Sequence, residues 1–593
     1  MARLHGFTKK QLKGIYQKMG LSRRLDEKML ILLKQGKSYF HIGASGHEAA
    51  QLAAATAMRP GEDWAFPYYR DAALCIGLGM TSREQLLCFL AKADDPNSGG
   101  RQMPQHYGHK DLRIVSQSSP TGTQFLQAVG CAMARKMEKT KDVVYVSSGE
   151  GTTSQGDFHE ALNWASNAKA PVIFHIQDND YAISTHKSLQ SADSVYAMAA
   201  GYKNLSRYDV NGTDFFETNL AFKQAIDRAR KGKGPSLIVS NVVRLLPHSS
   251  SDDQRKYRSE DDLAEDRKRD PLIVLEAQCV KEKFITAKEF EKIRQDIQVQ
   301  VDADTQWADA QDHPDVDTAL NHIYSDDITL SEPDFNAKTD KIVIVDAINH
   351  ALKEEMAHNE KMIIYGQDIA DPKGGVFTAT KGLSDMFGSQ RVFNSPLAES
   401  SIVGTAIGMA VTGYKPVVEI QFGDYIWTAM MHIRNELSTM RYRSNNDWTC
   451  PVVIRVPVGG YIHGSLCHSQ SIDGFFIHIP GIYLAYPSNA ADAKGLLKMA
   501  CRMNDPVIFM EHKGLYRQGY AATEEPGEDY VLPFGKARIV SEGDEISIIT
   551  WGAMVQKSIE GVKSLGLPEG TVEIIDLRTL NPLDLDTIEA SLE

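Results

Sequence analysis

Short apolar runs rich in β-branched residues recur between about residue 40 and residue 240, and longer stretches with helical periodicity separate them. Three such runs are Val143–Val146, Val172–Ile176 and Leu237–Val239. Runs of this length that are apolar throughout are typical of strands buried on both faces of a parallel sheet, with helices as the crossovers. The pattern predicts an α/β fold built on a doubly wound parallel sheet.

The same alternation starts again near Lys341 and continues through apolar runs that begin at Pro416, Pro451 and Pro506. It predicts a second doubly wound domain. A third α/β unit opens near Leu532, and we expect it to be incomplete because the 62 residues from there onward are few for such a domain. The predicted division of the chain is 1–324, a linker at 325–340, 341–531 and 532–593.

A strongly charged segment follows the first block, since 14 of the 20 residues from Ser251 to Asp270 are charged. We expect a solvated loop from Arg244 to Asp270, because so many charges are costly to bury together. A polar helical stretch follows this loop and leads to the linker.

The overall composition is that of an ordinary globular protein, with 42% apolar and 24% charged residues. The net charge of −13 argues against non-specific binding to nucleic acid or to an anionic membrane, since both favour a basic surface. No apolar run approaches the ~18 residues that span a bilayer, and the N-terminal sequence lacks the apolar stretch of a secretory signal. We therefore expect a soluble, cytoplasmic protein that binds neither nucleic acid nor membrane.

Seven cysteines are dispersed along the chain, without a C-x-x-C pair or a histidine at zinc spacing. An odd, scattered set in a long chain predicts reduced thiols in the core, rather than a disulfide framework or a structural zinc site. The seven are Cys75, Cys88, Cys131, Cys279, Cys450, Cys467 and Cys501.

The segment Asp142–Ser184 places polar groups at the ends of two neighbouring predicted strands. Glu150 lies between two glycines after the first strand, and Asn179 follows the second. Because a βαβ crossover is right-handed, both side chains are expected at the carboxyl edge of the sheet, where ligands bind. The glycines allow close approach to the backbone, a helix starting after Thr152 favours a diphosphate, and the side-chain oxygens suit Mg²⁺ or Ca²⁺. On spacing alone, an ordinary turn followed by a polar loop is the simpler interpretation.

The full string in this region resembles the thiamine diphosphate motif in the α subunit of 2-oxo acid dehydrogenases. The shared letters are G-E-G, then S-Q-G-D-F-x-E-A-L-N, then N-x-Y-A-I-S. The resemblance implies thiamine diphosphate and Mg²⁺, with Glu150, Asn179 and the carbonyl of Tyr181 as metal ligands. It also implies that Ile183 supports the thiazolium ring. The remaining cofactor contacts expected in this string are Gly149, Gly151 and Thr152.

At three positions in or beside this string, the residue differs from the one that is usual in the family. Glu150 replaces the commoner Asp, as it also does in branched-chain members. Asp178 stands where Asn is usual, and Gln177 stands where some members have Arg. The expected metal ligands are retained.

Two earlier segments match the same subunit in order and spacing, GRQMPQHYG at residues 100–108 and SSPTGTQFLQAVG at residues 118–130. Before them, Tyr69 and Arg70 in AFPYYRDAAL match the family's Y-R pair. By resemblance, these two residues bind the cofactor diphosphate, and a guanidinium suits that task. Ser119 and Thr121 are expected at the same site.

The segment SSPTGTQ also resembles a loop that binds a potassium ion in branched-chain members. The potassium ligands that the resemblance implies are Ser118, Pro120, Thr123 and Gln124. A Ser/Thr cap on the following apolar helix is the alternative interpretation, and both can hold at once.

The segment Arg244–Ser259 resembles the catalytic loop of branched-chain members, R-x-x-x-H-S-x-S-D-D-x-x-x-Y-R-S, in every fixed letter. By resemblance, His248 faces the cofactor and the incoming lipoyl group, and imidazole can exchange protons near neutral pH. Pro247 replaces a His seen in many relatives. Ser249 and Ser259 occupy positions that are phosphorylated in mitochondrial relatives.

The segment Arg391–Ala429 reads as the end of a strand, a helix from about Glu399 that stops at Gly413, and a further strand. Taken alone, Glu399 is equally explained as a complement to the helix dipole. The string resembles the β subunit of the same enzymes, in which L-x-E supplies the glutamate that activates the cofactor's aminopyrimidine ring. The pyrimidine pocket that the resemblance implies consists of Leu397, Glu399, Gln421 and Tyr425.

The string HGSLCHSQS at residues 463–471 matches the β-subunit pattern H-G-x-x-x-H-S-Q-S. The match implies that His468 is a second active-site histidine. Metal binding by His463 and His468 is the less favoured interpretation, because a spacing of five on a glycine-containing loop is not a typical ligand pattern.

The resemblance covers residues 10–300 with the α subunit and 340–593 with the β subunit, in one polypeptide. It implies two thiamine diphosphate-binding doubly wound domains and the start of a C-terminal α/β domain of the transketolase type. The implied reaction is oxidative decarboxylation of a 2-oxo acid, with reductive acylation of the lipoyl domain of a dihydrolipoyl acyltransferase. G-E-G, Y-A-I-S and H-S-x-S-D-D favour the branched-chain type, which acts on 3-methyl-2-oxobutanoate. Pyruvate is the alternative, because branched-chain relatives carry a larger apolar residue in place of Thr121.

Two other classes of protein are alternatives to a 2-oxo acid dehydrogenase. A transketolase-like transferase uses the same cofactor but lacks the H-S-x-S-D-D loop. A non-catalytic scaffold would have lost Glu150, Asn179 or Glu399, and all three are present. We further expect a homodimer with two active sites built from both halves of the sequence, in which Gly404 and Gly408 offer a face for close packing.

Overall fold

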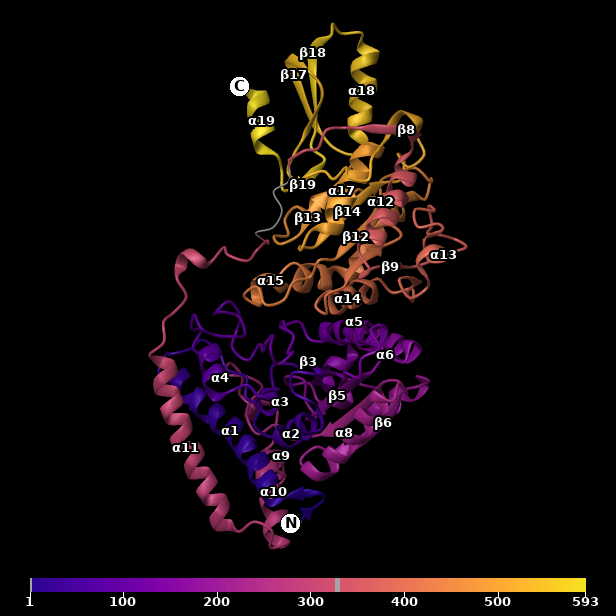
Figure 1. The fold of residues 1–593 in the computed structure, drawn as a ribbon. Helices are drawn as coiled ribbons and strands as arrows, with labels where there is room; N and C mark the ends of the chain where they lie inside the picture. The colour runs from indigo at the N-terminus through magenta and orange to yellow at the C-terminus, as the bar shows by residue number, and fades with distance from the viewer. Residues whose placement is uncertain (1–2, 326–330) are drawn as a thin grey trace. The chain divides into compact units, whose positions relative to one another are not determined.

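The fold is taken from a computed structural model that describes residues 3–325 and 331–593 (Figure 1). The chain forms two compact units. The first comprises residues 1–322 together with 440–448, and the second comprises 323–439 together with 449–593. The boundary near residue 322 lies close to the expected linker, but the sequence did not predict that residues 440–448 pack with the first unit.

A five-stranded parallel sheet forms the centre of the first unit, in the order β3-β4-β5-β7-β6. The predicted apolar runs lie in three of these strands, so the expected parallel α/β sheet is confirmed. The strands are β3 (Trp64–Phe66), β4 (Val144–Gly149), β5 (Val172–Asp178), β7 (Ser236–Asn241) and β6 (Ser206–Asn211).

Helices cover both faces of this sheet, which explains why its strands are apolar on both sides. On β5, Phe174 contacts Phe125, whereas the next residue, His175, contacts Phe222. Alternate residues of a strand point to opposite faces, so Phe125 and Phe222 mark helices on opposite sides. The covering helices include α5 (Thr123–Met137) and α6 (Gly156–Ala168) on one face, and α1 (Lys9–Lys34), α2 (Glu48–Ala57) and α8 (Phe215–Arg230) on the other.

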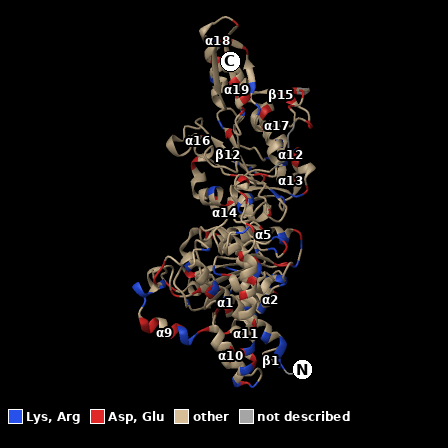
Figure 2. Ribbon diagram, turned by 90° about the vertical axis from the view of Figure 1, so that its left-hand side faces the viewer, with Lys and Arg blue, Asp and Glu red and all other residues tan. Residues whose placement is uncertain are grey.

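The charged segment 244–270 is not a loop throughout, as the sequence analysis expected. It contains the helix α9 (Glu260–Lys268), whose first turn is acidic and whose last turn is basic (Figure 2). Ser259 and Asp262 form a capping box at its start. Charges arranged in this order complement the helix dipole, so a nearly all-polar segment still forms a helix. The helices α10 (Pro271–Lys281) and α11 (Ala287–Asp309) follow it, and α11 is the predicted polar helix.

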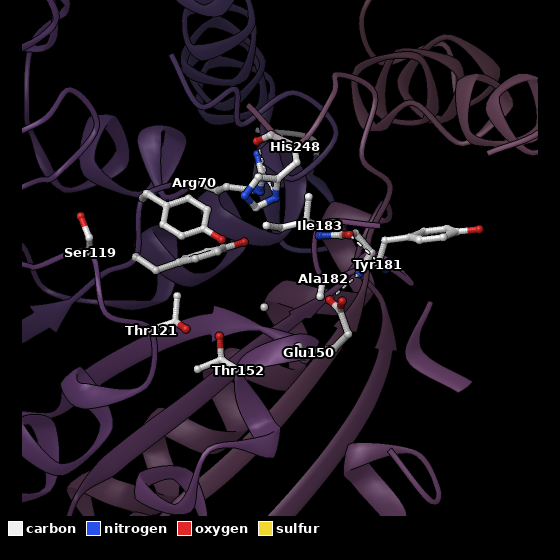
Figure 3. A pocket seen from close by; sticks show the side chains of 14 residues that line it. Arg70, Ser119, Thr121, Glu150, Thr152, Tyr181, Ala182, Ile183 and His248 are labelled. Carbon is white, nitrogen blue, oxygen red and sulfur yellow. Dashed lines mark hydrogen bonds between the residues drawn. The ribbon is translucent and has the colours of Figure 1, made fainter. Parts of the chain in front are cut away.

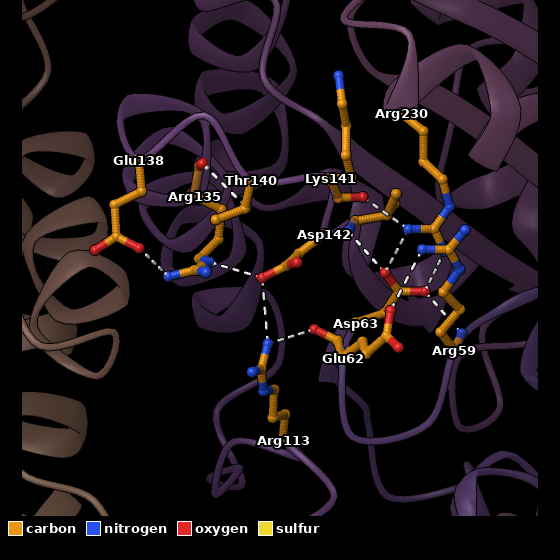
Figure 4. Close-up of polar contacts among 11 residues, drawn as sticks. Arg59, Glu62, Asp63, Arg113, Arg135, Glu138, Thr140, Lys141, Asp142 and Arg230 are labelled. Atoms are coloured by element: carbon orange, nitrogen blue, oxygen red, sulfur yellow. Dashed lines mark hydrogen bonds and ion pairs between the residues drawn. The ribbon is translucent and has the colours of Figure 1, made fainter.

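Opposite the carboxyl edge, an ion-pair cluster joins the amino ends of β3 and β4 (Figure 4). Arg230 donates to both carboxylate oxygens of the buried Asp63, at 3.0 and 2.6 Å. The same carboxylate accepts from the backbone N–H groups of Arg59 and Val143. A buried charge with four donors is fully satisfied, so this cluster fixes the strand starts.

The second unit is built on a seven-stranded sheet in the order β10-β9-β11-β12-β14-β13-β19, parallel except for its last strand. Its helices include α12 (Ile344–His358) and α17 (Ala490–Arg502), which pack against each other. The strands are β10 (Val392–Asn394), β9 (Met362–Gly366), β11 (Lys415–Glu419), β12 (Val453–Val458), β14 (Val507–His512), β13 (Tyr483–Ala485) and β19 (Thr579–Asn581).

The helix α14 (Glu399–Ala410) begins at the predicted residue. Gly413 has a φ of +93° shortly after it and β11 follows, as expected. However, Ser400–Ala410 are all buried within the single chain, Gly404 and Gly408 included. The expected contact of this helix face with a second copy stays a prediction.

The predicted linker 325–340 overlaps a strand. Residues 326–330 lie outside the described part of the chain, but β8 (Ala337–Ile342) pairs antiparallel with β15 (Thr523–Pro526). Polar composition alone suggested a linker, and the pairing partner lies far away in the sequence. The composition of this segment therefore did not reveal its strand.

The C-terminal segment forms a three-stranded sheet in the order β16-β18-β17, with α18 (Ala553–Leu565) connecting β17 to β18. The strands are β16 (Arg538–Ser541), β17 (Gly543–Thr550) and β18 (Gly570–Asp576). After β18, the chain contributes β19 to the seven-stranded sheet and ends in α19 (Leu585–Leu592).

Six of the seven cysteines are buried, as expected for core thiols. Cys467 is exposed, which the sequence analysis did not predict, because it lies in the glycine-containing loop before His468 rather than in a core element. Across residues 3–325 and 331–593, no helix combines the length and the apolar character required to cross a membrane.

Candidate active site

Glu150 and Asn179 meet at the carboxyl edge of the first sheet, where the sequence placed them. β4 ends at Gly149 and β5 at Asp178, and the two strands are parallel neighbours with Gly149 opposite Gln177. The backbone N–H of Asn179 donates to Glu150 Oε2 at 3.3 Å. Two residues that are 29 positions apart therefore share one end of the sheet because a βαβ crossover joins them.

A cavity of about 320 Å³ opens at this edge (Figure 3). It gathers every cofactor contact that was expected in the first half of the chain. These are Tyr69, Arg70, Ser119, Thr121, Gly149, Glu150, Gly151, Thr152, Asn179, Tyr181, Ile183 and His248. Tyr68 and Ala182 also line the cavity and were missed, although each is adjacent in sequence to a predicted contact.

Glu150 is buried at the floor of the cavity. Burial raises the pKa of Glu150 to about 7, and the negative charge of Asp178 adds to the rise. Its Oε1 atom is buried without a hydrogen-bond partner among the described residues. A buried carboxylate with an open lone pair is costly unless a cation or a proton joins it, so this donor fits Mg²⁺.

The glycines next to Glu150 allow the chain to pass closely over the cavity floor. A Cβ on Gly151 would lie 2.8 Å from the Cβ of Ala182, so a side chain there would displace the cavity wall. The helix itself starts later than predicted. A 3₁₀ turn at Glu150–Ser154 comes first, and α6 begins at Gly156 rather than after Thr152.

Arg70 and His248 form one hydrogen-bonded pair at the cavity rim. Arg70 Nη2 donates to the carbonyl of His248 at 2.8 Å and lies 3.1 Å from its Nδ1. A guanidinium has donors only, so Nδ1 is the acceptor and the proton of the neutral imidazole lies on Nε2. Tyr69 packs beside both, with its ring 5.3 Å from the guanidinium.

The sequence predicted that His248 exchanges protons near neutral pH, but its surroundings shift its pKa away from that range. Burial and the positive charges of Arg70 and Arg244 together lower its pKa to about 4, although Asp252 offsets part of the effect. At pH 7 the ring is therefore neutral. Its Nε2–H remains a hydrogen-bond donor, so the geometry favours positioning of a reactant over a change in charge.

A second buried arginine fixes the cavity wall. Arg244 donates to the carbonyls of Ala182 and Ile183 at 3.0 and 3.1 Å, and to the hydroxyl of Tyr257 at 2.8 Å. Asp252 accepts from the Tyr257 hydroxyl and from the backbone N–H of His248. Matched positions of the segment Arg244–Ser259 therefore form one hydrogen-bond network. Its members are Arg244, His248, Asp252 and Tyr257, and their spacing in the sequence did not predict the contacts.

The four residues expected to bind potassium lie close together in sequence: Ser118 and Pro120 are in the loop before α5, and Thr123 and Gln124 are the first two residues of that helix. Thr123 Oγ1 donates to the Pro120 carbonyl at 3.2 Å, and Gln124 Nε2 donates to the Ser147 carbonyl at 3.0 Å. The Ser/Thr cap that was considered as an alternative is wrong. The N-cap residue is Gly122, and in the described structure no side chain caps it.

The second unit holds a further group of expected residues. Glu399, the first residue of α14, accepts from Gln367 Nε2 at 3.1 Å and from Thr428 Oγ1 at 3.2 Å. Neither partner was predicted, because Gln367 lies outside the matched strings and Thr428, although inside Arg391–Ala429, is 29 residues from Glu399 in the sequence. The partners also hold the carboxylate at a defined place at the helix start.

His468 lies close to Tyr425, whose hydroxyl is 2.7 Å from Nε2. The other ring nitrogen of His468 is 3.1 Å from the Gly464 carbonyl. Gln421 donates to Asp368 at 2.8 Å, while the side chain of Leu397 is 83% exposed. Among residues 3–325 and 331–593, no cluster of three or more His, Cys, Asp or Glu could hold a metal, and the metal set proposed here needs only one carboxylate.

Comparison with protein families accounts for almost the whole chain. Residues 16–317 match the dehydrogenase E1 component family, and residues 340–518 match the transketolase pyrimidine-binding domain. Residues 535–593 match the transketolase C-terminal domain. The chain belongs to the dehydrogenase E1 component family.

Curated relatives match the two halves separately. The chain is 42% identical to the α subunit of 2-oxoisovalerate dehydrogenase from Bacillus subtilis over 322 residues, which are 54% of this chain and 97% of that protein. It is 48% identical to the β subunit of the same enzyme over 244 residues, 41% of this chain and 74% of that protein. It is 44% identical to the β subunit of the B. subtilis pyruvate dehydrogenase E1 component over 253 residues, 43% of this chain and 77% of that protein.

These matches confirm that α-type and β-type parts are fused in one polypeptide. The chain is an E1 component of the thiamine diphosphate-dependent 2-oxo acid dehydrogenases. The two thiamine-binding folds that the sequence implied, and the C-terminal transketolase-type fold, are confirmed with it. The relatives include both branched-chain and pyruvate enzymes at similar identity, so the comparisons do not select a substrate.

Proposed function

We propose that this E1 component decarboxylates a branched-chain 2-oxo acid, 3-methyl-2-oxobutanoate, and transfers the acyl group to the lipoyl domain of a dihydrolipoyl acyltransferase. The observation that supports it most is the cavity at the carboxyl edge of the first sheet. It brings together residues from four sequence motifs around one buried carboxylate oxygen that lacks a partner among the described residues.

In this proposal, Glu150, Asn179 and the Tyr181 carbonyl hold Mg²⁺, and Tyr69 and Arg70 hold the diphosphate. Thiamine diphosphate, when bound, supplies the electron sink that decarboxylation of a 2-oxo acid requires. Glu399 holds a proton at the pyrimidine 1′-nitrogen, with Leu397, Gln421 and Tyr425 around the ring. The partners Gln367 and Thr428 keep that carboxylate in place.

The same proposal includes a potassium ion at the junction between the loop Ser118–Gly122 and the start of α5. A monovalent ion there would stabilise Ser118–Gln124, from which Ser119 and Thr121 reach the cavity. Cofactor affinity should therefore be higher in potassium buffer than in sodium buffer. Equal affinity in the two buffers would contradict the ion site.

The branched-chain substrate is favoured by the residue patterns and by the 48% identity to a 2-oxoisovalerate dehydrogenase β subunit. Pyruvate is the second candidate, because the 44% identity to a pyruvate dehydrogenase β subunit is close to it. We expect kcat/KM for 3-methyl-2-oxobutanoate to exceed that for pyruvate in a panel of 2-oxo acids with Mg²⁺ and an artificial electron acceptor. A higher kcat/KM for pyruvate would make pyruvate the substrate. If the enzyme turned over none of the 2-oxo acids, both candidate substrates would be wrong.

His248→Ala should reduce lipoyl-dependent turnover far more than turnover with a small artificial oxidant. His248 is proposed to position the lipoyl ring through its Nε2–H, after carbon dioxide has left. The loss of one hydrogen-bond donor that acts in the transition state costs about 10²–10³-fold in rate. Turnover of the variant in the two assays, each relative to wild type, measures the difference.

The exposed His358 offers a matched control, because His358→Ala should change neither assay. Equal losses in both assays for His248→Ala would place His248 in cofactor binding or decarboxylation. The proposed role in acyl transfer would then be wrong.

We also propose a homodimer with two active sites, each formed from α-type and β-type parts. The support is the presence of both halves of one thiamine site in each chain. Light scattering should give the mass of two chains. A mass of one chain together with full activity would refute the dimer.

A further inference from the structure

Residues 41–46, which we call the bracket, connect α1 to α2 and lie against residues 243–250, the histidine segment. Backbone hydrogen bonds join the two. Ser250 N–H donates to the His41 carbonyl at 2.8 Å, and Leu245 N–H donates to the Ser45 carbonyl at 3.2 Å. The His41 N–H donates in turn to Ser250 Oγ at 3.1 Å. His248 lies between these two attachment points.

The bracket and the histidine segment approach each other as closely as a backbone without side chains allows. Gly46 has a φ of +105°, and a Cβ added there would lie 2.1 Å from the carbonyl oxygen of Val243. A Cβ on Gly43 would lie 2.5 Å from Leu246 Cδ1. Any movement of the bracket is therefore transmitted to the segment that bears His248.

Arg70 links the same two segments through its side chain. Its Nη1 donates to the Gly43 carbonyl at 2.7 Å, while its Nη2 donates to the His248 carbonyl at 2.8 Å. The guanidinium is planar and rigid, so the position of Gly43 sets the position from which Arg70 holds His248.

A buried carboxylate on α1 holds the bracket from beneath. Asp26 is only 3% exposed, and its Oδ2 accepts from the Ala44 N–H at 2.8 Å and from Ser45 Oγ at 2.7 Å. His41 Nε2 lies 3.4 Å from Asp26 Oδ1, and Gln105 accepts from the Ile42 N–H at 3.1 Å. Within the described part of the chain, neither Asp26 nor Gln105 lines the cavity.

We propose that Asp26 is a positioning residue for acyl transfer, which acts through the bracket to set the place of His248. This inference rests on the proposed function, in which His248 serves the lipoyl-dependent step. The bracket has no secondary structure of its own, so side-chain hydrogen bonds hold its conformation, and the two that it donates to Asp26 Oδ2 fix Ala44 and Ser45 directly. A reacting group displaced by about 1 Å can lose on the order of 10²-fold in rate.

The first test compares Asp26→Ala with Asp26→Asn. Asp26→Ala removes the acceptor and should lower lipoyl-dependent kcat about 10–100-fold, with a much smaller loss in the artificial-oxidant assay and little change in KM for the 2-oxo acid. Asp26→Asn keeps an oxygen of the same shape and should restore most of the lipoyl-dependent rate. Equal losses in both assays, or an Asn variant as impaired as the Ala variant, would overturn the positioning role.

The second test needs no turnover. Gly46→Ala should raise deuterium uptake in the backbone amides of residues 243–250, since the new Cβ forces Val243 away. Gly36→Ala is the matched control, because Gly36 also has a positive φ (+73°) but no described atom lies within 4 Å of its Cβ. Unchanged uptake in Gly46→Ala, or an equal rise in both variants, would refute the coupling.

The two tests separate this inference from the proposed function. If the wild-type enzyme did not acylate a lipoyl domain, the proposed function would fail while the exchange result still reported whether the bracket holds the histidine segment. If lipoyl-dependent turnover were present and the Gly46 variant exchanged normally, only the role of the bracket would fail.

Discussion

Glu399→Gln should bind thiamine diphosphate almost as well as the wild-type enzyme and lose nearly all turnover. Glutamine keeps the shape of the side chain and can still pair with Gln367 and Thr428. It cannot give or take a proton at the pyrimidine 1′-nitrogen, and a missing acid–base group of this kind costs about 10²–10⁴-fold in rate. Binding and catalysis should therefore separate in this variant.

The measurement that decides it is hydrogen–deuterium exchange at carbon 2 of the thiazolium ring, which should slow by a factor similar to the loss in turnover. The exposed Glu360 provides the control, because Glu360→Gln makes the same chemical change on the surface of the second unit. Exchange at the wild-type rate in Glu399→Gln would mean that a different residue activates the cofactor.

The local part of the candidate site was predictable because its residues are tied to strand ends. Glu150 and Asn179 each follow a run of buried β-branched residues, and the handedness of the crossover brings neighbouring strand ends together. Tyr69, Thr121 and the other contacts were expected at the same edge only because the chain resembles a known family. The start of α14 at Glu399 was predictable, since helix and strand signals there are all local.

The support beneath the cavity could not be predicted, because its contacts join distant segments. Gln177, which stands where some relatives have Arg, donates to Asp71 at 2.6 Å and lies 2.8 Å from His47 Nδ1. Its amide thus belongs to a buried network rather than, within the described residues, to the cavity lining. Burial raises the pKa of Asp71 to about 7, which shows that the charged form of this carboxyl is destabilised in the folded protein. The sequence alone does not show that Asp71 is buried.

The two errors in the fold have different origins. The strand β8 looked like a linker because its pairing partner β15 is far away in the sequence, with Ile342 opposite Thr523. The helix α9 looked like a loop because its charges were counted without regard to their order along the helix dipole. The composition of a segment indicates how much of it can be buried. Strand pairing, in β8, and helix capping, in α9, determine the structure that it adopts.

Glu150→Ala and Asn179→Ala should each abolish most of the Mg²⁺-dependent affinity for thiamine diphosphate. Each removes one oxygen from an ion that is proposed to hold the diphosphate, and loss of one partner from a buried charge pair costs about 3–5 kcal/mol. Glu150 should show the larger effect, because it alone supplies a negative charge. Isothermal titration calorimetry with and without Mg²⁺ measures the loss, and Asp193→Ala, an exposed carboxylate outside the cavity lining, is the control.

The pH dependence of the same binding gives an independent check on the metal role. Burial raises the pKa of Glu150 to about 7, so in the metal-free protein this carboxyl is protonated below that pH and charged above it. A cation binds only the charged form, so cofactor affinity in the presence of Mg²⁺ should fall about tenfold per pH unit below pH 7 and level off above it. The sign for stability is opposite, because a raised carboxyl pKa means that the metal-free fold loses stability as pH rises from the ordinary carboxyl range to about 7. Glu150→Gln should remove both dependences, and a binding profile with the same slope in Glu150→Gln would show that another group binds the ion.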